Sequence, residues 1–147
     1  MTDPTTTIHV DQFLAHPPAK VWRVLTEPDL IARWLMPNDF APVVGHRFTM
    51  RTQPRPGQGF DGWVHGEVRE VDPPRRLRWA WRGGGLDTEV SWTLVPEGRG
   101  TRLFLEHSGF DPGDPLQQRT ARLLDGGWRS HVWARLADAL ATCGPSV

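Results

Sequence analysis

The sequence has no tyrosine, one cysteine and one lysine, and each scarcity removes a class of chemistry. A single cysteine, Cys143, excludes an intrachain disulfide framework and a zinc site built from several cysteines. Lys20 is the only candidate for covalent catalysis through a lysine amine, and its helical pattern places it on a helix surface. The fold must therefore be stabilised by its core, and lysine chemistry is not expected.

Net charge and long apolar runs are absent too. The 17 basic residues balance the 17 acidic residues, so no overall positive field favours nucleic acid or an anionic membrane. Apolar runs of only a few residues and a mean hydropathy of −0.46 exclude a membrane-spanning helix. The segment Met1–Pro4 carries no export signal of the basic-then-apolar kind. We therefore expect a cytoplasmic protein that binds no nucleic acid and does not insert into membranes.

Glycine, proline and tryptophan are plentiful. The length of 147 residues suits one compact domain over 1–147, with an ordered core at about 8–141. The 15 glycines and 14 prolines predict many tight turns, which are typical of a β-rich chain. The 8 tryptophans each bring a large apolar ring with one N–H donor. Where those rings point therefore bears directly on function.

Hydrophobic periodicity predicts an α+β fold. Apolar spacings of three and four residues predict helices, and alternation between turns predicts antiparallel strands. In order, we expect a strand at 8–14, short helices at 17–27 and 28–36, strands at 45–51, 61–71, 76–82, 88–95 and 101–108, and a long helix at 115–140. Because only the last helix is long enough to cover the apolar face of the sheet, we expect the sheet to curve around it.

Two positions interrupt these patterns. Val68 and Val71 are separated by an odd step, which predicts a β-bulge in the strand at 61–71. Which of its residues face inward therefore stays open. In the long helix, Gly126 and Gly127 predict either a kink or room for a bulky group.

A series of short motifs runs along nearly the whole chain. They are Pro-Pro-Ala-Lys-Val-Trp at 17–22, Thr-Glu-Pro-Asp-Leu at 26–30, Arg-Trp-Leu at 33–35, Gly-Glu-Val at 66–68, Val-Asp-Pro-Pro-Arg-Arg-Leu at 71–77, the stretch 79–81, Gly-Thr-Arg-Leu at 100–103, His-Ser-Gly-Phe at 107–110 and Gly-Gly-Trp at 126–128. In this order they resemble the activator of heat-shock protein 90 ATPase homologue-like family of the START-like (SRPBCC) superfamily. The resemblance implies a helix-grip fold: a curved antiparallel sheet wraps a long C-terminal helix, two short helices follow the first strand, and a deep cavity separates sheet and helix. The superfamily includes lipid carriers, hormone receptors, cyclases and co-chaperone modules, so it implies a fold more securely than an activity.

The main functional hypothesis is a small hydrophobic or aromatic ligand bound in that cavity. Trp79, Trp81 and Trp92 alternate on strand faces expected to point inward, and so many large rings favour a cavity over simple filling of the core. The alternative that they only fill the core stays open. The candidate ligand-binding residues are Phe48, Met50, Trp63, His65, Trp79, Trp81, Trp92, His107 and Trp128.

Two other functions stay open. One is an interaction module of the chaperone ATPase activator kind, with a chaperone as partner. The other is a cyclase- or hydrolase-like enzyme with His65, Glu67 or His107 as its ionisable group. We assign no catalytic residue, expect neither a metal nor a cofactor, and expect a binding protein rather than an enzyme, either a monomer or a homodimer. A group of arginines suits either an acidic partner or a solvated outer sheet face, of which the second is favoured: Arg69, Arg75, Arg76, Arg78 and Arg82.

Overall fold

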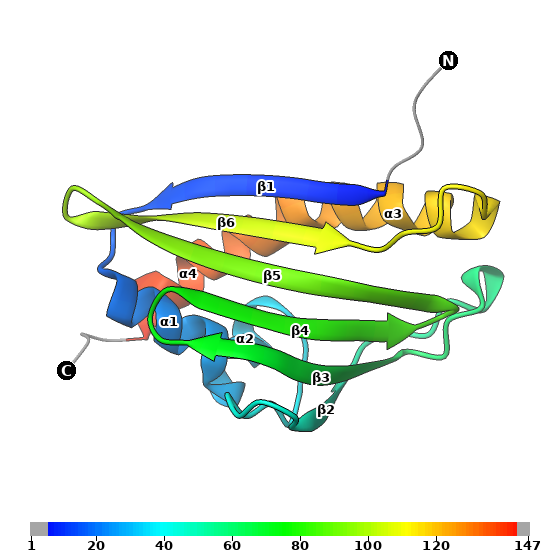
Figure 1. Ribbon diagram of the computed structural model, residues 1–147, viewed down its shortest axis with the longest axis horizontal. Coiled ribbons are helices and arrows are strands. Elements are labelled where there is room, and N and C mark those ends of the chain that lie inside the picture. Colours follow the sequence, from blue (N-terminus) through cyan, green and yellow to red (C-terminus); the bar gives the residue numbers. More distant parts are fainter. Residues whose placement is uncertain (1–5, 144–147) are drawn as a thin grey trace, which may run out of the picture.

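The computed structural model describes residues 6–143, and Figure 1 shows a broad curved sheet with a long helix behind it. The segment Met1–Pro4, in which no export signal is expected, lies outside this range. The elements in chain order are β1 (Thr7–Leu14), α1 (Pro18–Thr26), α2 (Pro28–Trp34), β2 (Arg47–Arg51), the 3-10 turn η1 (Pro56–Gln58), β3 (Trp63–Asp72), β4 (Arg76–Gly83), β5 (Leu86–Glu97), β6 (Gly100–Ser108), α3 (Pro115–Gly127), the π-helical turn η2 (Trp128–Val132) and α4 (Trp133–Thr142).

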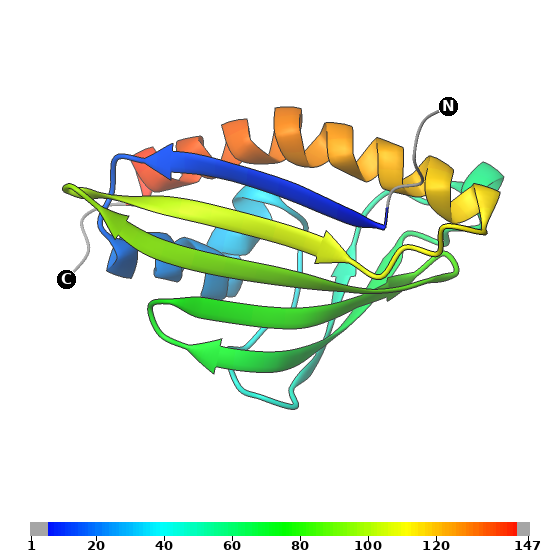
Figure 2. The same cartoon turned by 45° about the horizontal axis from the view of Figure 1, so that its top comes forward.

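The six strands form one antiparallel sheet in the order β1-β6-β5-β4-β3-β2. Figure 2 shows α3 and α4 running as one long helix over one face of this sheet. Helices α1 and α2 pack against α4 near one end. This is the α+β helix-grip fold expected from the sequence, with the long C-terminal helix, the two short helices after the first strand and the five strands between Val43 and Ser108 all confirmed.

Proline starts each of the helices α1, α2 and α3, because its fixed backbone angle suits the first helical position and its missing N–H costs nothing there. Asp114 adds a side-chain cap to α3: its carboxylate accepts from the backbone N–H of Leu116 at 2.9 Å and of Gln117 at 3.4 Å. These signals fix where the long helix begins and therefore which of its residues face the sheet.

Strand β3 contains the expected bulge. This is the strand for which the sequence leaves open which residues face inward. Its pairing with β4 shifts register between Val68 and Glu70. Before the shift, Val64 and Val68 are buried, while Trp63 and His65 on the alternate positions are exposed. The aromatic ring and the imidazole therefore lie on the outer face of the sheet.

The long C-terminal helix is continuous but irregular. A π-helical turn, η2, follows directly after Gly126 and Gly127. A π turn inserts an additional residue into the helix and is frequent at functional sites. Of the two outcomes predicted for the glycine pair, open space is present: a Cβ atom added at either glycine would meet nothing within 4 Å.

Candidate functional site

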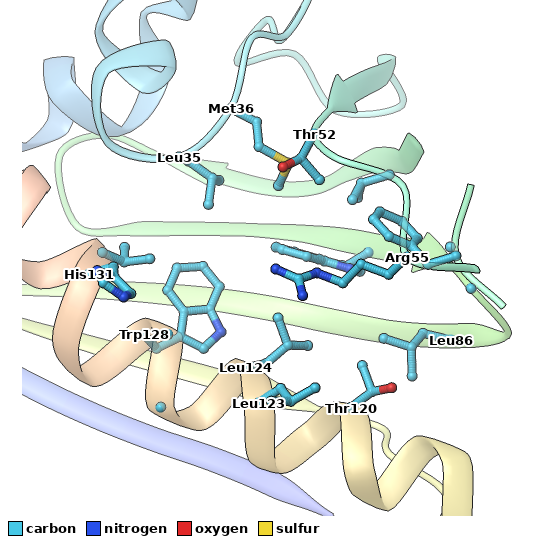
Figure 3. A pocket seen from close by; sticks show the side chains of 18 of the residues that line it. Leu35, Met36, Thr52, Arg55, Leu86, Thr120, Leu123, Leu124, Trp128 and His131 are labelled. Carbon is cyan, nitrogen blue, oxygen red and sulfur yellow. The ribbon is translucent and has the colours of Figure 1, made fainter. Parts of the chain in front are cut away.

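A cavity of about 560 Å³ lies between the sheet and the middle of the C-terminal helix (Figure 3). Leu124 and Trp128 form part of its helix side. Val64, Trp81 and Leu86, from three neighbouring strands, form part of its sheet side. The cavity thus occupies the space that the helix-grip fold leaves between its two layers.

Two loop segments complete the lining. Leu35 and Met36 follow α2, and Thr52, Arg55 and Phe60 belong to the connection between β2 and β3. This connection is held by its own backbone: the N–H of Arg55 donates to the carbonyl of Phe60 at 2.8 Å, and the N–H of Phe60 donates to the carbonyl of Arg55 at 3.1 Å. The loop therefore presents its side chains from a closed turn.

A buried chain of hydrogen bonds links the indole of Trp128 to the backbone of Trp81. The Nε1–H of Trp128 donates to Nδ1 of His107 at 3.2 Å. Because Nδ1 accepts, the ring proton of His107 must lie on Nε2, which donates to the hydroxyl of Thr88 at 2.8 Å. The Thr88 hydroxyl in turn donates to the backbone carbonyl of Trp81 at 2.8 Å. The chain thus joins the helix side of the cavity to its sheet side.

Burial lowers the pKa of His107 from 6.5 to about 3. The side chain is inaccessible to solvent, and both ring nitrogens are already hydrogen-bonded. A neutral imidazole with no free nitrogen and no solvent contact is suited to holding Trp128 in place rather than to moving protons.

The aromatic residues predicted to line the cavity mostly pack against one another. Trp81 and Trp128 do line it, with ring centroids 5.9 Å apart. Trp79 stacks behind Trp81 at 5.8 Å, and Trp92 meets Trp128 edge-on at 5.7 Å. Side chains two residues apart on a strand are separated by roughly 7 Å, so only those at the end of the strand near the cavity reach it. The expectation of direct lining is therefore corrected for the buried residues Phe48, Met50, Trp79, Trp92 and His107.

Trp63 and His65, which were also expected to line the cavity, do not face it. Both lie on the outer face of β3, because inward positions there are taken by Val64, Gly66 and Val68. Trp63 is 38% exposed and lies under the guanidinium of Arg51, which is 5.3 Å from the ring centroid. His65 borders a separate hollow of about 320 Å³ on that face.

Several lining residues were not among the predicted ligand-binding residues. Leu124 continues the apolar stripe of the long helix and could have been included with Trp128. His131 lines the cavity from η2, where the additional residue of the π turn changes which positions face the sheet. Met36 and Arg55 lie in loops, where no hydrophobic periodicity predicts the direction of a side chain.

The arginine cluster lies on the outer face of the sheet, with Arg75 in the turn between β3 and β4, and it is paired with carboxylates, which agrees with the favoured interpretation. Glu70 lies between two arginines, with its Oε1 3.1 Å from Nε of Arg76 and 3.6 Å from Nε of Arg78. Arg82 pairs with Asp87 at 3.1 Å. These charges are largely neutralised within the protein, so they offer little to an acidic partner.

With this geometry in place, a family model described as "Activator of Hsp90 ATPase homolog 1-like protein" matches residues 15–141. The chain belongs to this family. The resemblance drawn from the motifs is therefore confirmed over most of the chain. Among curated proteins, no sequence matches.

Several solved structures have the same helix-grip fold as this family member. Protein MLL2253 from Mesorhizobium loti is 35% identical, with a TM-score of 0.82 over 95% of this chain and 99% of that one. DynU16, a putative protein in the dynemicin biosynthetic locus, is 27% identical with a TM-score of 0.76 over 97% of this chain. This chain spans only 49% of DynU16.

The Aha1 dimer from Colwellia psychrerythraea, at 20% identity, shares the fold, with a TM-score of 0.76 over 96% of this chain and 100% of that one. Within residues 6–143 of this family member, no helix combines the length and the apolar character that crossing a membrane requires.

Proposed function

We propose that this protein binds a small apolar, ring-containing molecule in the cavity between its sheet and its C-terminal helix. The observation that carries the proposal is the cavity itself, with a volume of about 560 Å³ and indole, leucine, valine and methionine side chains in its lining. Ligand pockets have volumes of roughly 300–1,000 Å³ and mostly apolar walls with a few polar groups.

Three further observations support this proposal. Trp128 is held by the hydrogen bond from its indole nitrogen to His107, so one aromatic wall of the cavity is fixed before a ligand arrives. The π turn and the glycine pair both occur where the helix borders the cavity, although regular helix would be more stable there. A similar fold occurs in DynU16, a putative protein in the dynemicin biosynthetic locus.

Binding can be tested with a panel of apolar ring compounds, using calorimetric titration and the shift in Tm as readouts. A matched pair of variants locates the site: Leu124→Phe fills part of the cavity, whereas Leu116→Phe adds the same ring elsewhere on α3. We expect at least one compound to bind and to raise Tm, with affinity reduced about tenfold or more by Leu124→Phe and unchanged by Leu116→Phe. Equal effects of the two substitutions, or no binding by any compound, would overturn the proposal.

A second candidate is a protein-interaction module of the chaperone ATPase activator kind. It is favoured by the family description and by three exposed apolar side chains on the outer sheet face, Phe13, Val95 and Phe104. Phe13 pairs with Arg102, two residues from Phe104, so the two rings are diagonal neighbours. This function requires stimulation of a chaperone ATPase without any small ligand, and the stimulation should be lost in Phe104→Ser but kept in Leu124→Phe.

The enzyme alternative has less support. His107 lies behind the two indoles of the lining, and His65 and Glu67 belong to the outer face of β3. A catalytic acid or base must reach the substrate within hydrogen-bond distance. The three side chains named for this alternative are not among those that line the cavity.

A further inference from the structure

The ionisable side chains among the described residues that line the cavity are basic. Arg55 and His131 contribute basic groups, and no aspartate or glutamate is among the lining residues that the structure describes. The chain as a whole has equal numbers of acidic and basic side chains. A lining without carboxylates is therefore a local feature of this cavity and not a reflection of composition.

Arg55 differs from the arginine cluster on the outer face of the sheet. Arg76, Arg78 and Arg82 on the outer face are paired with carboxylates, whereas the ion pairs found within residues 6–143 do not include Arg55. Its backbone is fixed by the two reciprocal hydrogen bonds with Phe60. Figure 3 shows its side chain extending from the loop into the cavity, toward the side lined by Leu124 and Trp128.

Three other polar groups of the lining have partners within the protein. The hydroxyl of Ser130 donates to the carbonyl of Gly126 at 2.6 Å, and that of Thr120 donates to the carbonyl of Leu116 at 3.0 Å. The indole N–H of Trp128 donates to His107. Among the described residues that line the cavity, Arg55 alone is permanently charged, and its guanidinium has five N–H donors and no carboxylate partner.

We propose that the ligand of this cavity is an anion, namely an apolar ring system that carries a carboxylate. The inference rests on the proposed function and names its ligand class. The ring would occupy the apolar space beside Trp81 and Trp128, and the carboxylate would accept two parallel hydrogen bonds from Arg55. A loop arginine without an internal partner, over an apolar cavity without acidic residues, is the combination that selects such a molecule.

Two probes that share one ring system, of which only one is charged, distinguish the contribution of charge to binding from that of shape. 1-Naphthaleneacetate and its neutral amide, 1-naphthaleneacetamide, are titrated calorimetrically into the wild type, Arg55→Met and Arg55→Lys at low salt. Arg51→Met is the matched control, because Arg51 is a nearby arginine that lies over Trp63 on the outer face. The arginine at position 55 is exposed, so its loss should leave Tm unchanged.

We expect wild type to bind the carboxylate about tenfold more tightly than the amide, and this preference to disappear in Arg55→Met. Arg55→Lys should keep part of it, because a lysine supplies charge without the two-pronged geometry. Arg51→Met should keep the full preference for the carboxylate over the amide. Raising the salt concentration to about 0.5 M should weaken binding of the carboxylate but not of the amide, because the arginine is exposed and its charge is screened.

The failures of the two proposals are distinguishable. If the carboxylate and the amide bind the wild type equally, or if Arg55→Met weakens both to the same degree, the anion inference is wrong while the apolar cavity still binds. If neither probe binds the wild type, the inference is overturned together with the proposal that the cavity accepts ring compounds of this size.

Discussion

The indole N–H of Trp128 donates to Nδ1 of His107 at 3.2 Å, and this contact joins the C-terminal helix to the sheet inside the core. Both side chains are at most 2% exposed. His107 is in turn hydrogen-bonded to the Thr88 hydroxyl, which donates to a backbone carbonyl of β4. A histidine that sequence reasoning included among ligand-binding residues is therefore part of the support behind one wall of the cavity.

Removing the His107 side chain should strongly destabilise the folded protein. His107→Ala leaves the Trp128 N–H without an acceptor and opens a void beside Trp81, so we expect the free energy of unfolding to fall by about 3 kcal/mol or more. Urea denaturation measures the loss. His65→Ala is the matched control on the exposed outer face, and should change stability by less than about 0.5 kcal/mol. Comparable effects of the two variants would contradict a supporting role for His107.

The same histidine predicts how stability depends on pH. Its pKa is about 3 in the folded protein, against 6.5 for a solvated histidine, so between these values the unfolded chain binds more protons. The stabilisation is therefore complete above pH 6.5 and is lost as pH falls toward 3, with a slope of up to about 1.4 kcal/mol per pH unit.

The comparison with His107→Gln isolates this contribution, because all other titrating groups are shared. Denaturation at about pH 7 and about pH 4.5 should show the wild type's advantage over the variant shrinking by about 2 to 3 kcal/mol at the lower pH. An advantage that stays constant over this range would mean that the buried imidazole does not resist protonation.

The inner face of β3 depends on the absence of a side chain at Gly66. A Cβ atom there would overlap the ring of Phe48, which lies opposite on β2. Gly66→Ala should therefore lower the free energy of unfolding by about 1 to 3 kcal/mol, because a buried ring must move within a packed core. The double variant Gly66→Ala with Phe48→Leu should recover part of this loss, and no recovery would show that the ring is not the obstacle.

The fold was predictable from the sequence because its signals are local and repeated. Proline at the helix starts, alternation along β4 and β5, and the odd step at Val68 each predict an observed feature. The faces of β3 were harder, because Trp63 is as apolar as the valines beside it and alternation alone cannot say which set is inside.

The site was less predictable than the fold. The inward direction of Trp79 and Trp92 follows from alternation, but whether a ring meets a cavity or another ring depends on residues distant in the sequence. Arg55 is the clearest case: it belongs to a loop whose closure on Phe60 is set by hydrogen bonds, and no periodicity points its side chain toward the helix.

The glycine pair of the long helix offers a last test, in which stability and binding should change in opposite directions. Neither Gly126 nor Gly127 has a positive backbone φ angle, and a Cβ atom at either meets nothing within 4 Å. Replacing both with alanine should therefore stabilise the protein by about 1 to 2 kcal/mol through helix propensity. Both residues also line the cavity, so the added methyl groups narrow the space offered to a ring.

We accordingly expect Gly126→Ala with Gly127→Ala to raise Tm by several degrees while weakening binding of ring compounds several-fold. Ala134→Gly is the reverse control: it removes a methyl group from an exposed position of α4 outside the lining, and it should lower Tm without affecting binding. If the double alanine variant gains stability and binds as tightly as the wild type, the glycines do not serve the cavity. If it loses stability, the irregular turn that follows them requires their backbone freedom.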